Sequence, residues 1–279
     1  MRLDESLNAG SGVYFEGTLI DSLRTQYQLI EVFASPSLGR LMRIDGVNMT
    51  SERDEFFYHE ALVHPAAITH AAPRNVLIVG GGDGGSTEEM LKHPSVERVV
   101  LAELDDGVID MAKKYFADVH RNVFTNPKLE VRIGDGMAML KTTARHFDLI
   151  YLDLTDPIGP AEALYTPEFY RDCKGALSIG GALISHIGSP FSHPDRVKDS
   201  MTNLRDVFSC VAPYFVHIPS YGATWGFAVA SDSLDPRTTS AAEVEQRLHD
   251  RGVTDRQLYN GQTHTAMLAM PEYIKTLIG

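Results

Sequence analysis

The segment VLIVGGGDGGSTEEML, residues 76–91, decides the fold expected of this chain. Its four leading apolar residues, 76–79, are typical of a buried strand, and residues 86–91 have the composition of a helix start. The glycines between them let a ligand approach the backbone closely, as nucleotide-binding loops do. A strand, a glycine turn and a helix in this order predict a nucleotide-binding entrance.

Asp83 stands in the middle of the glycine run. Loops of this kind usually present free backbone N–H groups to a phosphate. A carboxylate at that place would repel a phosphate and attract a cation. We therefore expect a nucleoside-like ligand that is positively charged near Asp83, and a dehydrogenase with a pyrophosphate cofactor is disfavoured.

The rest of the chain from residue 75 onward alternates strand-like apolar runs with segments of helical spacing. This alternation predicts a parallel, doubly wound, Rossmann-like α/β sheet that binds its ligand at the C-terminal ends of the strands. The expected strands are 76–79, 98–102, 129–133, 149–152, 182–185, 214–218 and 226–230, and the expected helices are 105–116, 167–177, 194–208 and a short one beginning near Pro271.

The first 70 residues have a different texture. Strand-like runs at 27–33 and 40–44, with turn residues at 35–39, predict a small antiparallel β region. A helix over 51–69 is expected next, with Ser51 as its N-cap. We expect two domains: an N-terminal β region with its connecting helix over 1–70, and a Rossmann-like catalytic domain over 71–279.

Acidic residues follow four consecutive expected strands of the α/β region. A single Asp after a strand is more often a turn former or a helix cap. Four unpaired carboxylates at one rim would repel each other unless cations fill the space. Glu103 suits a ribose diol, and Asp135 could accept a hydrogen bond from an adenine amino group. The residues are Asp83, Glu103, Asp135 and Asp153, with Asp156 close behind.

This pattern predicts a site for a nucleoside with a cationic tail, and a second cation near Asp153 and Asp156. S-adenosylmethionine and its relatives fit, because they join adenosine to a sulfonium. The ordinary methyl donor also carries a carboxylate, which Asp83 would oppose. A decarboxylated donor keeps the ammonium and avoids this conflict.

The composition excludes several other classes. The net charge of −12, from 37 acidic and 25 basic residues, disfavours nucleic acid as a partner. Two cysteines, no signal-peptide layout at the N-terminus and no apolar run near the roughly 20 residues of a membrane span favour a cytoplasmic protein. His59 and His64 are five residues apart, about 140° around a helix, so no metal site is expected there.

Four segments, taken in order, resemble the spermidine synthases and more broadly the polyamine aminopropyltransferases. They are residues 51–60 (SERDEFFYHE), the glycine loop 80–85, residues 153–162, and the C-terminal Tyr259-Asn260 with residues 264–266. The resemblance implies that an amine attacks the aminopropyl carbon of decarboxylated S-adenosylmethionine and releases methylthioadenosine, with no permanently bound cofactor. It also implies a homodimer or a homotetramer.

The resemblance further implies roles for individual residues. By similarity, Asp153 is the proton acceptor, Tyr58 orients the attacking nitrogen, and Asp156 and Tyr221 belong to the acceptor site. The nucleoside and the aminopropyl arm would be held by Gln28, His59, Asp83, Glu103, Asp135, Gly136 and Pro160.

Three departures from the family pattern concern the acceptor. Met49 and His186 stand where the family commonly has Gln, and the segment 219–225 is one residue shorter. Putrescine is the default acceptor, and cadaverine, agmatine and spermidine remain open. Two other functions also remain: an S-adenosylmethionine methyltransferase, which Asp83 argues against, and a non-catalytic polyamine-binding protein, which would not need Asp153 and Tyr58 beside a complete nucleoside site.

Overall fold

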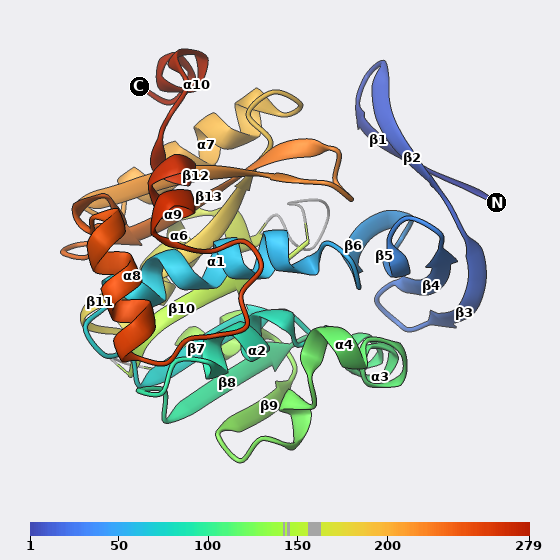
Figure 1. Ribbon diagram of the computed structural model, residues 1–279, viewed down its shortest axis with the longest axis horizontal. Helices are drawn as coiled ribbons and strands as arrows, with labels where there is room; N and C mark the ends of the chain where they lie inside the picture. The colour runs from blue at the N-terminus through green and yellow to red at the C-terminus, as the bar shows by residue number, and fades with distance from the viewer. Residues whose placement is uncertain (142, 144–145, 156–162) are drawn as a thin grey trace.

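The computed structural model describes residues 1–141, 143, 146–155 and 163–279 of the chain. Figure 1 shows a large unit, in which helices cover a central sheet, and a smaller β unit from the N-terminal part of the chain. This arrangement confirms the expected Rossmann-like α/β fold with a small antiparallel β region before it.

The N-terminal part of the chain is all β. It has more strands than the two that the sequence predicted, because the residues of β1 to β3 are mostly exposed or half-buried and so lack a strong apolar pattern. Strands β1 (Arg2–Asn8) and β2 (Ser11–Glu16) form an antiparallel hairpin, and β3 (Thr18–Arg24), β4 (Leu29–Ser35), β5 (Gly39–Ile44) and β6 (Val47–Ser51) form an antiparallel sheet in that order.

Helix α1 (Glu55–Thr69) connects the two sheets. The predicted start at Ser51 was wrong, because Ser51 pairs with Leu41 in the antiparallel ladder and ends β6. Its hydroxyl donates to Asp54 Oδ1 at 2.5 Å. The buried face of α1 packs with the apolar core of the large sheet. The division of the chain at residue 70 stays a prediction.

The large sheet has the order β12-β13-β11-β10-β7-β8-β9 in the described part of the chain. The five strands from β9 to β11 are parallel, as predicted. Strand β13 runs antiparallel to both of its neighbours, because β12 reaches it through a tight turn, and short connections join antiparallel strands. The bounds are β7 (Asn75–Gly80), β8 (Arg98–Glu103), β9 (Leu129–Ile133), β10 (Phe147–Asp153), β11 (Leu177–Gly188), β12 (Cys210–Ile218) and β13 (Ala223–Ser231).

Helices cover both faces of this sheet. The expected helices at 105–116, 167–177, 194–208 and after Pro271 are confirmed within a few residues, whereas α8 and α9, each with a capping box, were not expected. The described helices after α1 are α2 (Gly85–Leu91), α3 (Asp106–Tyr115), α4 (Ala117–His120), α5 (Gly136–Lys141), α6 (Pro167–Ala176), α7 (Pro194–Arg205), α8 (Ala241–Asp250), α9 (Gly261–Leu268) and α10 (Glu272–Ile278), with 3-10 turns η1 (Val123–Thr125) and η3 (Pro236–Thr238).

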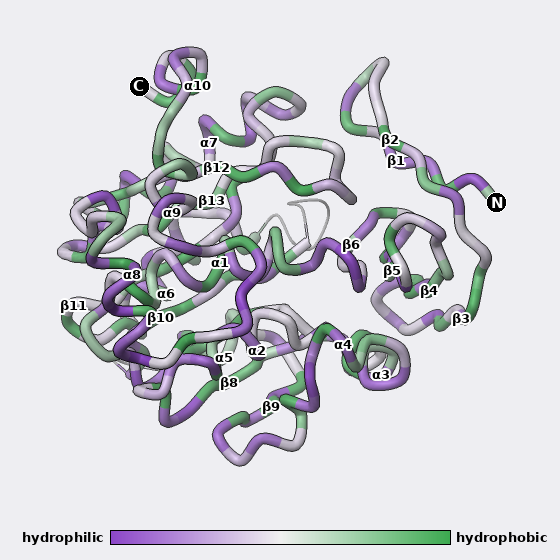
Figure 2. The backbone as a smooth tube through the Cα atoms, in the orientation of Figure 1, coloured by the Kyte–Doolittle hydropathy of each residue, from purple (hydrophilic) through white to green (hydrophobic). Residues whose placement is uncertain are grey.

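The core consists of two apolar layers, one on each face of the sheet. Alternate residues of β7 divide between them, since Val76 and Ile78 pack on the α1 side and Leu77 and Val79 on the other. Figure 2 shows hydrophobic stretches along α1 and hydrophilic segments in outer loops. Among the described residues, every helix is too short or too polar to cross a bilayer. The strand order reverses between β7 and β10, which is where this class of sheet opens a ligand crevice.

Candidate active site

The glycine loop after β7 lies against the end of β10. Gly80 pairs with Asp153 in the parallel ladder, and the Gly81 amide donates to the Asp153 carbonyl oxygen at 2.8 Å. Gly80 and Gly81 have φ angles of 80° and 67°, which residues with a side chain rarely adopt. A Cβ at Gly80 would collide with the Asp153 carbonyl. Because Gly80 and Gly81 have no side chain, the loop can lie directly against Asp153, the residue expected to be the proton acceptor.

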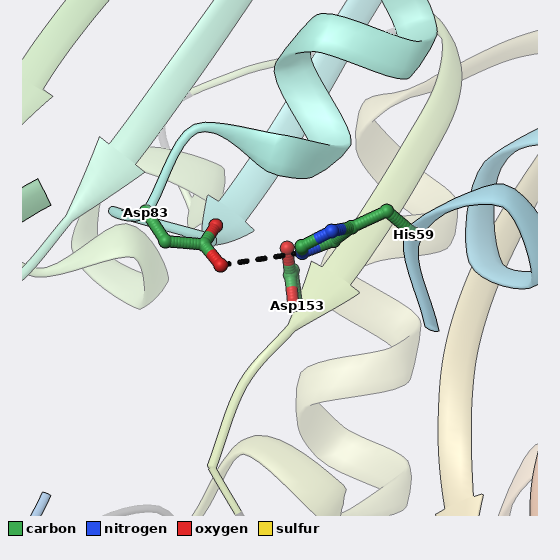
Figure 3. Close-up of side chains that lie close together, drawn as sticks. All are labelled: His59, Asp83 and Asp153. Carbon is green, nitrogen blue, oxygen red and sulfur yellow. Dashed lines mark ion pairs between the residues drawn. The ribbon is translucent and has the colours of Figure 1, made fainter. Parts of the chain in front are cut away.

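The sequence predicted an unpaired Asp83, but in the structure Asp83 forms an ion pair with His59. His59, from α1, lies with Nε2 at 3.3 Å from Asp83 Oδ2 (Figure 3). Its Nδ1 lies 2.7 Å from Glu55 Oε2. Burial by itself lowers the pKa of His59, but the two carboxylates outweigh it and hold this pKa well above its usual value. Although burial opposes it, His59 also lowers the pKa of Asp83. The ring is thus an imidazolium between two carboxylates.

Asp153, which is half-buried, and Tyr58, which is buried, form a second pair beside this one. Ser86 Oγ donates to Asp153 Oδ2 at 2.6 Å, and the Tyr58 hydroxyl is a further hydrogen-bond partner of Asp153. Burial first, and then the charge of Asp83, raises the pKa of Asp153. Burial and the charge of Asp153 raise the pKa of Tyr58 well above its usual value, so the phenol keeps its proton. A carboxylate with a raised pKa is a better proton acceptor.

His59, Asp83 and Asp153 bring one potential ligand atom each to within 4.8 Å of one another. The two carboxylates of this group suit a cation such as a substrate ammonium, whereas the His59 imidazolium would repel one. Both nitrogens of His59 already face carboxylates, so a metal would first have to displace a ring proton. His64 lies apart from this group, with Nδ1 at 3.1 Å from His93 Nε2. The expected absence of a metal stays a prediction.

Glu103 and Gln28 both hydrogen-bond to Asp105 at the next strand end, although 75 positions separate them in the sequence (103 − 28). The two Glu103 carboxylate oxygens accept from the Gly82 amide at 3.1 Å and the Asp105 amide at 3.0 Å. Burial raises the pKa of Glu103 to about 7. Gln28 Nε2 donates to Asp105 Oδ2 at 2.9 Å. The rim therefore gathers hydrogen-bond acceptors from both sheets, as a ribose diol requires.

Asp135 and Gly136, two further residues predicted to bind the aminopropyl donor, follow the next strand of the sheet. Asp135 is exposed before α5, where its carboxylate accepts from the Met137 amide at 2.8 Å, and Gly136 begins that helix. Strand β9, which leads into them, is the neighbour of β8. Asp156 and Pro160 lie outside the described residues.

A pocket beside Asp153 collects the residues that depart from the family pattern. Tyr221 donates to the Met49 carbonyl oxygen at 3.1 Å. The His186 Nε2 lies 2.6 Å from the Tyr165 hydroxyl, and the His186 ring stacks on Trp225 with centroids 5.8 Å apart. The pocket is lined by Glu5, Ser6, Leu7, Val47, Asn48, Met49, Tyr58, Leu154, Thr155, His186, His193, Tyr221 and Trp225.

Two kinds of residue escaped the sequence reasoning. Glu5 and its neighbours line the pocket from β1, a strand whose mostly polar sequence gave no strand signal. Glu55 was also missed, although a Glu four residues before a His on a predicted helix is a readable signal of a pair.

Comparison with known proteins identifies the family. A model of the family described as "Spermine/spermidine synthase domain" matches residues 55–242. A polyamine aminopropyltransferase of Nitrosomonas europaea is 49% identical over 98% of this chain and 85% of its own length. Polyamine aminopropyltransferase 1 of Pseudomonas aeruginosa is 38% identical over 99% of this chain and 96% of its own length.

Solved structures agree with the sequence comparisons. A spermidine synthase crystallised with the transition-state analogue AdoDATO superposes with a TM-score of 0.94 and 32% identity, over 100% of this chain and 95% of that one. The spermidine synthase of Thermotoga maritima gives a TM-score of 0.92 at 32% identity, over 100% and 94%. The chain belongs to the spermine/spermidine synthase family. It is an enzyme of the aminopropyltransferase class.

Proposed function

We propose that this aminopropyltransferase takes its aminopropyl group from decarboxylated S-adenosylmethionine and transfers it to putrescine, which yields spermidine and methylthioadenosine. The observation that carries the proposal is the placement of Asp83 and Asp153 beside the glycine loop, with Tyr58 on Asp153. The structural relative that binds AdoDATO, at a TM-score of 0.94, supports it.

The donor is chosen by charge. Asp83 presents a carboxylate whose pKa is lowered, so it is ionised and attracts the donor's ammonium. The nucleoside lies on the acceptor rim of Glu103 and Gln28, and Asp135 and Gly136 contact the adenine side. His59 contacts the aminopropyl arm from the α1 side. Pro160, expected near the adenine, belongs to the part of the proposal that rests on resemblance.

The chemistry needs a neutral amine. An alkyl ammonium has a pKa near that of lysine, so freeing its lone pair at pH 7 costs roughly 4.6 kcal/mol. The sulfonium of the bound donor disfavours a second cation nearby. The nitrogen lone pair then attacks the aminopropyl methylene carbon, the C–S bond breaks, and its electrons remain on sulfur. Asp153 takes the proton from the new secondary ammonium while Tyr58 orients the nitrogen.

The acceptor lies in the pocket lined by Met49, His186 and Tyr221. A diamine carries a second ammonium at its far end. Glu5 supplies a carboxylate on the β1 side of this pocket, where the Asn48 amide donates to its Oε2 at 2.8 Å. Asp156 contributes a further carboxylate by resemblance. The Glu5 carboxylate would attract the far ammonium of a diamine, and putrescine is proposed as the acceptor because it is the default of the family resemblance.

The assembly and the compartment also belong to the proposal. The family resemblance supports a homodimer or homotetramer that works in the cytoplasm, with no nucleic acid or membrane as a partner. Light scattering behind size-exclusion chromatography measures the assembly, and a monomer at micromolar concentration would overturn that part.

The deciding experiment measures methylthioadenosine released with decarboxylated S-adenosylmethionine and each of putrescine, cadaverine, agmatine and spermidine. We expect the highest kcat/KM with putrescine. A higher value with another amine would replace the acceptor and leave the reaction class intact. Methyl transfer from S-adenosylmethionine without methylthioadenosine would show a methyltransferase instead. Binding of diamines without turnover would show a polyamine-binding protein.

A further inference from the structure

Asp105 links the two sheets at the nucleoside rim. It follows β8 by two residues, is 1% exposed and caps helix α3. We infer that Asp105 is a positioning residue for the donor's ribose, because it holds both Gln28 and Glu103 in the orientation that accepts the sugar hydroxyls. This inference rests on the proposed donor site and adds a residue to it.

Every hydrogen-bonding group of Asp105 that faces this rim is engaged. Its backbone N–H donates to Glu103 Oε1 at 3.0 Å. Its Oδ2 accepts from Gln28 Nε2 at 2.9 Å and from Thr25 Oγ1 at 2.7 Å. Its Oδ1 accepts from the Gly107 amide at 3.1 Å, which is the helix cap. The side chain of Asp105 thus joins the β3–β4 turn to the start of α3, and its backbone N–H adds the end of β8.

The turn that carries Gln28 fits closely onto α3. The Thr25 hydroxyl accepts hydrogen bonds from the Tyr27 and Gln28 backbone amides at 3.1 and 3.2 Å. Asp105 therefore binds a turn that already has internal hydrogen bonds. A Cβ at Gly107 would lie 2.7 Å from Thr25 Cγ2. Gly107 therefore leaves the room that this docking needs. The contact between Thr25 and Gln28 on one side and Asp105 and Gly107 on the other thus fixes how the β3–β4 turn lies on the start of α3.

The carboxylate decides which way the Gln28 amide faces. An ionised Asp can only accept, so it selects the Nε2 side of Gln28 and turns Oε1 away from itself. A hydroxyl of the ribose can then donate to Oε1. The Asp105 backbone N–H likewise fixes Oε1 of Glu103. The remaining lone pair of this oxygen is available to the second hydroxyl of the ribose. An asparagine at this position could keep the helix cap through its Oδ1, but its Nδ2 would then face Gln28 and favour the opposite orientation of the Gln28 amide.

The experiment is a comparison of Asp105→Asn with the unaltered enzyme. Isothermal titration calorimetry measures the affinity for methylthioadenosine and for its 2′-deoxy and 3′-deoxy analogues. We expect Asp105→Asn to weaken methylthioadenosine binding about tenfold, the effect of losing one charge-assisted hydrogen bond. Its preference for methylthioadenosine over the deoxy analogues should shrink by a similar factor. In turnover, the donor KM should rise about tenfold while kcat and the acceptor KM stay within about twofold.

Two controls keep the inference falsifiable. Asp235→Asn changes another N-cap carboxylate, at η3, and should leave every affinity unchanged. Thr25→Val removes one hydrogen bond to Asp105 and the two that the Thr25 hydroxyl accepts from the Tyr27 and Gln28 backbone amides, so it should also weaken methylthioadenosine binding and reduce the discrimination against the deoxy analogues. An Asp105→Asn enzyme that discriminates the deoxy analogues as well as the unaltered enzyme overturns the inference. If the unaltered enzyme itself does not discriminate them, the donor site of the proposed function is wrong as well.

Discussion

Replacing Asp83 by asparagine tests which donor the site selects. Asn keeps the size of the side chain but removes the charge that would face the aminopropyl ammonium. The His59 imidazolium, at 3.3 Å from Asp83 Oδ2, would also lose one of its two carboxylate partners. We expect Asp83→Asn to lose affinity for the decarboxylated donor but not for an uncharged nucleoside.

The size of the effect follows from the geometry. An ammonium about 4 Å from a carboxylate gains about 4 kcal/mol at an effective dielectric constant near 20. In this site Asp83 shares its charge with His59, so the donor receives only part of that gain. A charge-assisted hydrogen bond contributes about 1.5–3 kcal/mol, and we take about 2 kcal/mol here. That value corresponds to a loss of roughly 30-fold in affinity.

Calorimetric titration with three ligands separates the causes. The affinity for decarboxylated S-adenosylmethionine should fall roughly 30-fold, while that for S-adenosylmethionine should change by less than about threefold, because its carboxylate no longer meets a like charge. Methylthioadenosine lacks both groups and should bind as before, which checks that the site is still folded. An unchanged ratio between the two charged donors would refute the assignment of Asp83.

Three further predictions concern the base, the nucleoside rim and metals. Asp153→Asn should lower turnover by about 10²–10⁴ and keep methylthioadenosine affinity, and near-normal turnover would remove Asp153 as the base. Methylthioadenosine should bind about tenfold more weakly at pH 6 than at pH 8, because Glu103, with a pKa of about 7, gains a proton and loses acceptor capacity as the pH falls. Glu103→Gln should bind weakly with little pH dependence, and a flat profile in the unaltered enzyme would count against this role. Exhaustive chelation should leave turnover unchanged, and activity that returns only with a divalent metal would show a metal site.

The local sequence of residues 76–91 was sufficient to predict the strand, the glycine loop and the helix after it. The alternation of strand-like and helical segments was also sufficient to predict the parallel part of the sheet, because strands buried on both faces, such as β7 and β8, have nearly continuous apolar sequences. The same rule placed the carboxylates of several strands at one rim. It could not show that β13 reverses, since strand direction depends on the turn that precedes it.

Only the tertiary structure showed which partners the carboxylates have. Asp83 was predicted as an unpaired charge, yet the packing of α1 against the large sheet brings His59 to it. The pocket beside Asp153 joins β1, the start of β6 and the β12–β13 turn, which are remote from one another in the sequence. The sequence by itself determined the residue types and the local backbone that holds them, because both depend on near neighbours. Only the tertiary structure decided which charge meets which, since that depends on how the two sheets and α1 pack together.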